Sequence, residues 1–120
     1  MLHGFFGGFI RIHVLHHAAE APIYGLAMMD ELRRHGYEVG PGTLYPLLHE
    51  MEESGFLAQE ERVVEGRVRK YYRATPAGTQ ALREIREKVR ELVGELLEGE
   101  GPVLLDDSVP AKVRPTTKKA

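Results

Sequence analysis

The segment 40–55 constrains the fold of this chain most, because its spacing is that of a single amphipathic helix. Gly40-Pro41-Gly42-Thr43 precedes the helix, and proline is acceptable in the first turn. Gly55 is the expected stop, and Pro46 lies early enough that only a mild bend is expected. Four apolar residues recur at i, i+3, i+4 and i+7, the stripe of a helix packed on a core: Leu44, Leu47, Leu48 and Met51.

Two more helices are predicted before this one. Residues 5–19 are mostly apolar, and their length favours a largely buried helix over a strand. Gly7 and Gly8 each cost a helix about 1 kcal/mol relative to Ala, so we expect the helix to start near Phe9, unless these glycines let another chain approach closely. A second helix is predicted from about Tyr24 to Arg34, with Gly36 as its stop. Its expected buried side consists of Leu26, Met28, Met29 and Leu32.

Two strands are predicted after the clearest helix, over residues 57–64 and 67–74. Glu65-Gly66 between them suits a tight hairpin turn, because glycine tolerates positive φ. Side chains alternate between the faces of a strand. One face of the second strand is therefore basic, with Arg67, Arg69, Tyr71 and Arg73, and the other is mainly apolar, with Val68, Lys70, Tyr72 and Ala74.

A long final helix is predicted from Thr75-Pro76, a hydroxyl cap followed by proline, to about Glu98. Its apolar residues form a coiled-coil-type seam of about two heptads. The seam could pack within its own subunit, but so long a helix beside so small a core favours a partner chain, and we predict a homodimer. The expected dimerisation residues are Leu82, Ile85, Val89, Leu92 and Leu96, with Phe9 from the first helix.

Composition excludes several classes of protein. The chain has 120 residues and no cysteine, which rules out disulfides, thiolate metal sites and cysteine nucleophiles and is compatible with a reducing cytoplasm, where we expect the protein. No apolar run approaches the roughly 20 residues of a membrane span, and the first residues do not resemble a signal peptide. Two serines, Ser54 and Ser108, with no P-loop or dinucleotide motif, give no basis for catalysis, so we predict that the chain is not an enzyme.

The charge distribution is more informative than the net charge of −2. Residues 1–56 hold three basic against seven acidic side chains, whereas the predicted hairpin, 57–75, holds five basic against three acidic. The positive excess therefore lies on the hairpin, where phosphate binding competes with the alternative of an ordinary solvated strand face.

Three histidines share one face of the first predicted helix. His13, His16 and His17 lie at i, i+3 and i+4, and His13 with His17 has the spacing of a metal-ligand pair. Only Glu20 offers a carboxylate near enough in sequence. Scattered polar positions on a helix are the more common explanation, and we predict neither a metal nor a cofactor.

The order of helix, helix, helix, hairpin and long helix predicts a mainly α fold with a small β-hairpin. Residues 1–75 would form a winged helix-turn-helix domain, 76–98 a dimerisation helix and 99–120 a flexible tail. A helix with one face on the core can place the other in a DNA major groove, while a basic hairpin reaches phosphates or the minor groove.

Three sequence blocks resemble the PadR family of bacterial and archaeal transcriptional regulators. They are GTLYPLL at 42–48, EESGFL at 52–57 and RKYYRATPAG at 69–78, and the resemblance extends over roughly 8–98. The single C-terminal helix is similar to the short subfamily. The resemblance implies a homodimer held by the last helix and partly by the first, a third helix that reads DNA, and commonly repression relieved by a small ligand.

The resemblance also implies which residues contact DNA. The start of the recognition helix would contribute Gly42, Thr43, Tyr45 and Pro46, with Tyr45 on a phosphate and His49 near a base edge. The basic wing would contribute Arg67, Arg69 and Lys70. Many family members have basic residues in the second half of that helix, where this chain has Glu50, Glu52 and Glu53. We therefore expect modest affinity with strong salt dependence.

The sequence thus predicts a sequence-specific DNA-binding transcriptional regulator, a homodimeric repressor on an inverted-repeat operator in double-stranded DNA. A winged-helix module that binds only protein is the alternative. A small-molecule effector could lie in an apolar space near Phe5, Phe6 and Phe9, although dimer core packing is the better explanation of these aromatic residues.

Overall fold

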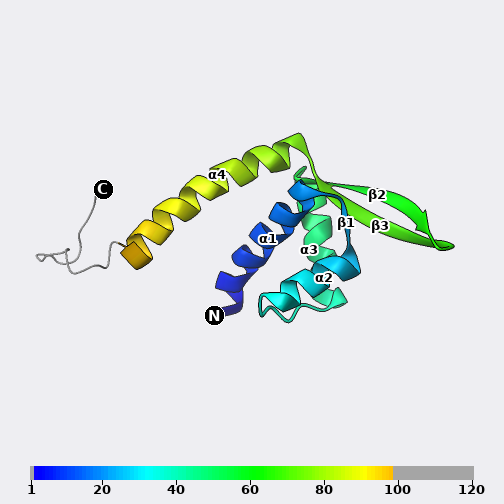
Figure 1. Cartoon of the computed structure of the whole chain (residues 1–120), viewed down its shortest axis with the longest axis horizontal. Helices are drawn as coiled ribbons and strands as arrows, with labels where there is room; N and C mark the ends of the chain where they lie inside the picture. Colours follow the sequence, from blue (N-terminus) through cyan, green and yellow to red (C-terminus); the bar gives the residue numbers. More distant parts are fainter. Residues whose placement is uncertain (1, 99–120) are drawn as a thin grey trace, which may run out of the picture. The chain divides into compact units, whose positions relative to one another are not determined.

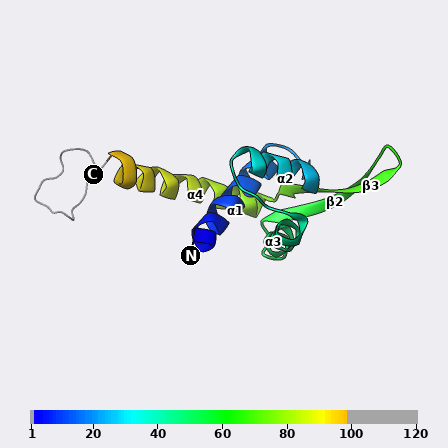
Figure 2. The same ribbon diagram turned by 90° about the horizontal axis from the view of Figure 1, so that it is seen from below.

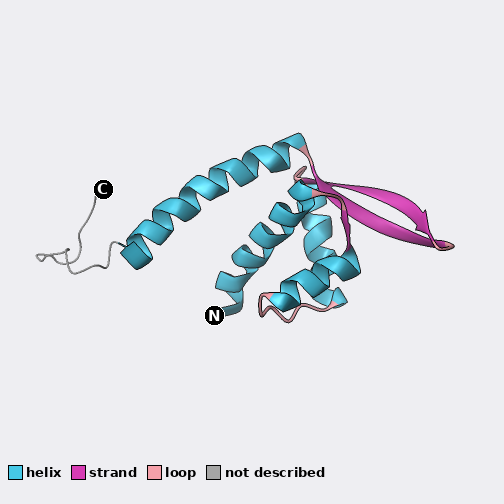
Figure 3. Ribbon diagram, in the orientation of Figure 1, coloured by secondary structure: helices cyan, strands magenta, loops and turns pink. Residues whose placement is uncertain are grey.

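The computed structural model of this chain describes residues 2–98, so the predicted tail at 99–120 lies outside the described residues. Three helices lead into a hairpin and a further helix (Figures 1 and 3). The chain divides into two compact units at Arg83–Glu84. The elements are α1 (Leu2–Glu20), β1 (Ile23–Tyr24), α2 (Gly25–Arg34), α3 (Pro41–Glu53), β2 (Leu57–Val64), β3 (Arg67–Ala74) and α4 (Pro76–Val93), followed by a π-helical segment, Gly94–Glu98.

The core of the first unit lies between α1, α2 and α3. The apolar stripe predicted for α3 is buried in full, which confirms that helix and its orientation. Since the stripe occupies one side only, the opposite side of α3 is left to solvent. The largest fully buried side chains come from all three helices: Val14, Met28, Leu32, Leu44 and Leu48.

The hairpin has the predicted strands and the predicted turn. Strands β2 and β3 pair antiparallel from Leu57 with Ala74 to Val64 with Arg67. Glu65 and Gly66 both have positive φ, 52° and 77°, as a two-residue turn that follows the strand twist requires. The hairpin extends beyond α1–α3 in both views (Figures 1 and 2).

A third strand was not predicted from the sequence. Strand β1 pairs antiparallel with β3, which becomes the central strand in the order β1-β3-β2. In this pairing Ile23 lies opposite Tyr72, and Tyr24 lies opposite Tyr71. Two residues are too few to show the alternation by which strands are recognised, so this pairing exists only because the folded chain brings the segment beside β3.

Three details of the helix predictions were wrong. The first helix was expected to be largely buried, but only three of its described residues are buried, all in its second half: Val14, Leu15 and Ala18. Helix α1 begins at Leu2 and continues through Gly7 and Gly8, instead of starting near Phe9. Leu26 was expected to be buried but is 61% exposed. The buried side of α2 begins with Gly25, one residue before Leu26. Gly25 lies on the same helix face as the other buried residues, Met28, Met29 and Leu32.

Thr75 caps α4 as the sequence predicts, and the structure shows that it also anchors the start of this helix to the residues that follow α3. The Thr75 hydroxyl donates a hydrogen bond to the Gly55 carbonyl (2.6 Å) and accepts one from the Gly78 amide (3.0 Å), so Thr75 caps the helix. A side chain at Gly78 would overlap the backbone carbonyl of Phe56. This close approach fixes the first turn of α4 on the first unit.

Candidate nucleic-acid interface

The exposed side of α3 carries all five residues that were predicted to face DNA on this helix. Its first turn closes on the Gly40 carbonyl, which accepts hydrogen bonds from the Thr43 and Leu44 amides (3.1 and 2.9 Å). Recognition by this helix end would therefore depend mainly on side chains. The exposed residues are Gly42, Thr43, Tyr45, Pro46 and His49.

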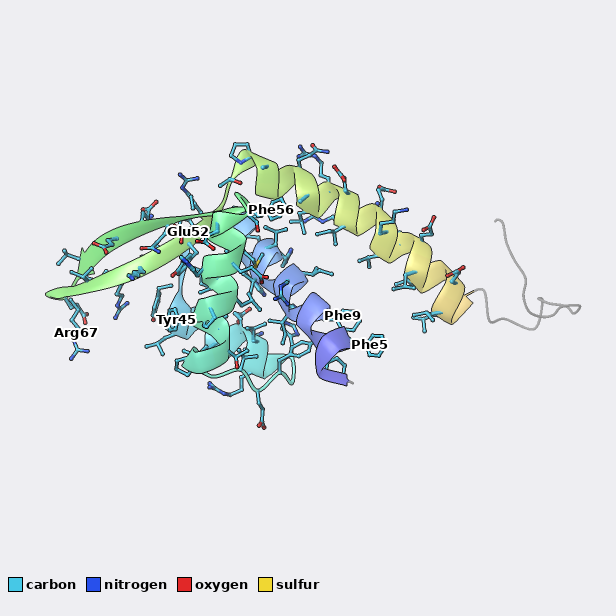
Figure 4. The ribbon with its side chains drawn as sticks, turned by 180° about the vertical axis from the view of Figure 1, so that it is seen from behind. Phe5, Phe9, Tyr45, Glu52, Phe56 and Arg67 are labelled. Atoms are coloured by element: carbon cyan, nitrogen blue, oxygen red, sulfur yellow. The ribbon has the colours of Figure 1, made fainter. Side chains whose placement is uncertain are left out.

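Tyr45 is held in a defined position at 39% exposure. Its ring lies against the start of α2, and a side chain at Gly25 would overlap the Tyr45 ring and hydroxyl. Figure 4 shows Tyr45 on the flank of α3 that looks toward the hairpin. Gly25 is thus a positioning residue that the sequence did not reveal, since only the packing of α2 on α3 makes its missing side chain matter.

Each acidic side chain in the second half of α3 has a partner. Glu50 forms an ion pair with Arg11 of α1 (2.7 Å). Glu52 accepts a hydrogen bond from the side-chain amide of Gln59 in β2 (3.4 Å). Glu53 lies 3.3 Å from the imidazole of His49, which stays exposed. Arg11 offsets part of the negative charge that the sequence places on this helix.

One face of the hairpin carries arginines stacked on tyrosines. Residues paired directly across antiparallel strands share a face, so Arg69 lies with its partner Arg62. The Arg69 guanidinium lies 4.6 Å from the ring centre of Tyr24, and that of Arg62 lies 4.6 Å from the ring centre of Tyr71. Such stacking occupies the flat side of a guanidinium and leaves its N–H edge for anions. The edge of Arg62 already donates a hydrogen bond to the Glu60 carboxylate (2.7 Å), so Arg69 is the stacked arginine that remains for a phosphate.

The three basic residues predicted for the wing do not share one face. Arg67 and Arg69 lie on the face that carries Tyr24 and Tyr71. Lys70 lies on the opposite face, beside the exposed pair Val63 and Val68. Neither Arg67 nor Lys70 forms an ion pair with any residue whose side chain the structure describes. Figure 4 shows Arg67 at the far end of the hairpin.

Tyr72 has a packing role. It is only 4% exposed. Burial, followed by the neighbouring Glu52 carboxylate and Tyr45, raises the pKa of the Tyr72 hydroxyl above its ordinary value, which keeps it neutral.

The predicted dimerisation residues differ in exposure. Leu82 is only 3% exposed within its own chain and Ile85 is half-buried. Farther along α4, and in the segment after it, Val89, Leu92 and Leu96 are exposed. In the first unit Phe9 is exposed too, on the side of α1 marked in Figure 4. Leu82 thus already contributes to the core of its own subunit.

Three packed helices followed by an exposed β-hairpin define a winged helix-turn-helix protein. The family model described as the transcriptional regulator PadR-like family matches residues 14–84, and the chain belongs to this family. It is therefore a PadR-like transcriptional regulator. Such regulators generally bind DNA as dimers.

Known proteins extend the similarity beyond the matched residues. The transcriptional regulator Rv3488 of Mycobacterium tuberculosis is 54% identical over 91 residues, which cover 76% of this chain and 85% of that protein. A PadR family regulator from Eggerthella lenta is 39% identical, with a TM-score of 0.65 over 76% of this chain and 83% of that one. The protein smu.1704 from Streptococcus mutans is 25% identical, with a TM-score of 0.71 over 81% and 92%. Among residues 2–98 there is no helix with the length and apolar character needed to cross a bilayer.

Proposed function

We propose that this protein is a sequence-specific repressor that binds an inverted-repeat operator as a homodimer. The start of α3 enters the major groove and the hairpin contacts the phosphate backbone beside it. A two-fold symmetric pair of such units matches two half-sites one helical turn apart. The observation that carries the proposal is that the exposed side of α3 and the basic hairpin belong to one compact unit.

The residues divide into two roles on DNA. Thr43 and His49 lie on the exposed side of α3, where hydroxyl and imidazole groups can hydrogen-bond base edges. Tyr45, held against Gly25, directs its hydroxyl to a phosphate. Such backbone contacts set the register of the protein on the duplex and carry no sequence information themselves.

The hairpin provides most of the electrostatic attraction. Phosphates are neutralised by the stacked Arg69 and by Arg67 and Lys70. Neither Arg67 nor Lys70 forms an ion pair within the described residues, although Glu61 lies opposite Lys70 across the hairpin. Each neutralised phosphate releases a condensed counterion, which makes affinity fall steeply with salt. With few such cations in each subunit and acidic side chains nearby, affinity at physiological salt is modest.

The distal seam of α4 completes the dimer. Val89, Leu92 and Leu96 are exposed in the single chain, and burying a leucine contributes about 1.5–3 kcal/mol. A small apolar ligand near Phe5, Phe6 and Phe9 of α1 would relieve repression by changing the separation of the two recognition helices. These aromatic side chains are all exposed, as either a ligand site or a dimer contact requires.

Operator binding of the full chain tests the proposal. We expect a fluorescent duplex from the DNA upstream of the gene to bind as two subunits per duplex and to be displaced by unlabelled operator more readily than by unrelated DNA. Arg69→Ala should weaken binding and reduce the salt dependence, because each lost phosphate contact removes about 0.9 from the slope of log affinity against log salt.

Arg33→Ala is the matched control, since Arg33 is an exposed arginine at the end of α2, paired with Asp30 outside the hairpin. It should leave the affinity and the salt slope unchanged. If the wild-type dimer shows no preference for any duplex, including one selected from a random pool, a module that binds only protein becomes the better assignment.

A further inference from the structure

We propose that His13, His17 and His35 form a binding site for a divalent transition-metal ion of the Zn²⁺ class, which bridges α1 and the end of α2. This site is separate from the proposed DNA-binding surface and does not depend on it. The sequence shows His13 and His17 as a pair at i, i+4 on one helix. The third imidazole comes from another element, and only the fold brings it to them.

The three imidazoles are close enough to bind one ion. One ring nitrogen from each lies within 4.8 Å of the others. The rings of His13 and His35 have centres 4.5 Å apart, and those of His13 and His17 are 6.3 Å apart and nearly parallel. Ligand nitrogens on a tetrahedral zinc ion stand about 3.3 Å apart, as Zn–N bonds of about 2.0–2.1 Å require. Small side-chain rotations would close the difference.

His17 carries an unsatisfied nitrogen at the cluster. Its Nε2 atom is buried and has no hydrogen-bond partner. The nearest charged atom is a Glu31 carboxylate oxygen at 3.4 Å, which forms no hydrogen bond with it. Buried polar atoms are almost always partnered, so a bound ion accounts for this one. Glu31 is not part of the group, and its other carboxylate oxygen is paired with Arg34.

The other nitrogen of His17 lies near a carboxylate. Its Nδ1 atom lies 3.9 Å from a carboxylate oxygen of Glu20, one turn farther along α1. Metal-binding imidazoles commonly direct their second nitrogen to a carboxylate, which orients the ring and increases its basicity. At 3.9 Å the contact is too long for a hydrogen bond, so Glu20 lies near the His17 ring without fixing its orientation.

A second group on α1 offers an alternative. His16, His17 and Glu20 also bring three ligand atoms within 4.8 Å of one another. They share one helix face, contain only two imidazoles, and leave His35 and the buried nitrogen of His17 unused. The group that includes His35 is the better site for two reasons. It joins two elements of the fold, and it gives a role to both His35 and the buried nitrogen of His17.

Metal titration of the untagged full chain tests the proposal. After treatment with a chelator, Zn²⁺ is titrated by calorimetry, and Co²⁺ by the intensity of its visible absorption, which reports coordination number. We expect one ion per chain, with His35→Ala reducing affinity at least about 10-fold, the scale on which metal sites respond even to loss of supporting contacts. Zn²⁺ should also raise the melting temperature of the wild type more than that of the variant.

Three further histidine variants make the result specific. His49→Ala removes an exposed imidazole of α3 outside the cluster and should leave Zn²⁺ affinity unchanged, as should His16→Ala. His13→Gln provides a second loss-of-ligand variant, and far-UV circular dichroism confirms that each variant folds. The proposal is overturned if the wild type binds no ion stoichiometrically, if folded His35→Ala and His13→Gln bind like the wild type, or if His16→Ala reduces affinity while His35→Ala does not.

Discussion

Helices α3 and α4 carry the same kind of apolar stripe, yet the fold treats the two stripes differently. The four stripe residues of α3 are all buried between neighbouring elements of the first unit. On α4, Leu82 is buried, whereas Leu92 remains 45% exposed. Periodicity therefore reports that one side of a helix is apolar, and it does not report whether the same chain or a second one covers that side.

The difference follows from where each helix lies in the contact network. Helix α3 packs against α2 and β2, so its stripe is satisfied within one chain. The start of helix α4, which belongs to the first unit, is held by the Thr75 cap, by the close approach of Gly78 to Phe56 and by the buried Leu82. The stripe beyond these turns needs another surface to be buried, and in the proposed dimer that surface is a second copy.

Leu48→Ala should have the largest effect on the free energy of unfolding. Leu48 is fully buried, and a leucine-to-alanine change in a core costs about 2–5 kcal/mol, because the cavity collapses only in part. Chemical denaturation measures the loss. Leu26→Ala is the matched control, since Leu26 is exposed on α2, and it should stay within about 0.5 kcal/mol of the wild type. Equal losses in the two variants would contradict the packing described for α3.

Leu92→Glu should act on association and spare the fold of the subunit. A carboxylate in an apolar seam must be desolvated without a partner, which costs at least as much as the lost leucine contact of about 1.5–3 kcal/mol. Because a homodimer carries the substitution twice, sedimentation equilibrium should show a dissociation constant raised by at least about two orders of magnitude, with the circular dichroism spectrum retained. Glu91→Gln, on the neighbouring exposed position, is the control. An unchanged dissociation constant for Leu92→Glu would place the dimer interface elsewhere.

Thr75→Ala should have the smallest effect of the three, about 1 kcal/mol, typical of a lost helix cap. The lost contacts are the hydrogen bonds to the Gly55 carbonyl and from the Gly78 amide. Thermal unfolding at fixed concentration measures the change, and Thr75→Ser should restore the cap. Because the cap belongs to the first unit, the dimer dissociation constant should move less than in Leu92→Glu. A larger movement would show that the start of α4 controls its distal seam.

Much of the fold could be predicted because it is local. The stripe of α3, the two long strands and the Glu65-Gly66 turn depend on neighbours only a few residues apart. Strand β1 could not be predicted, because its two residues become a strand only beside β3. The glycines in α1 misled the prediction, because helix propensity is a weak preference that its surroundings can override.

The candidate site divides in the same way. The exposed residues of α3 and the basic strand face could be predicted from periodicity. The contact between Tyr45 and Gly25, the Arg69–Tyr24 stack and the approach of His35 to His13 join residues from different elements. No local pattern encodes such pairs.

The sequence by itself determined which segments become helices and hairpin strands, which side of each is apolar, and where the positive charge gathers, because all of these depend on spacing along the chain. The tertiary structure decided which apolar side is covered within the chain, how Tyr45 is held, and that a third histidine joins the pair on α1. These depend on distances between residues far apart in sequence, which are set only when the elements pack together.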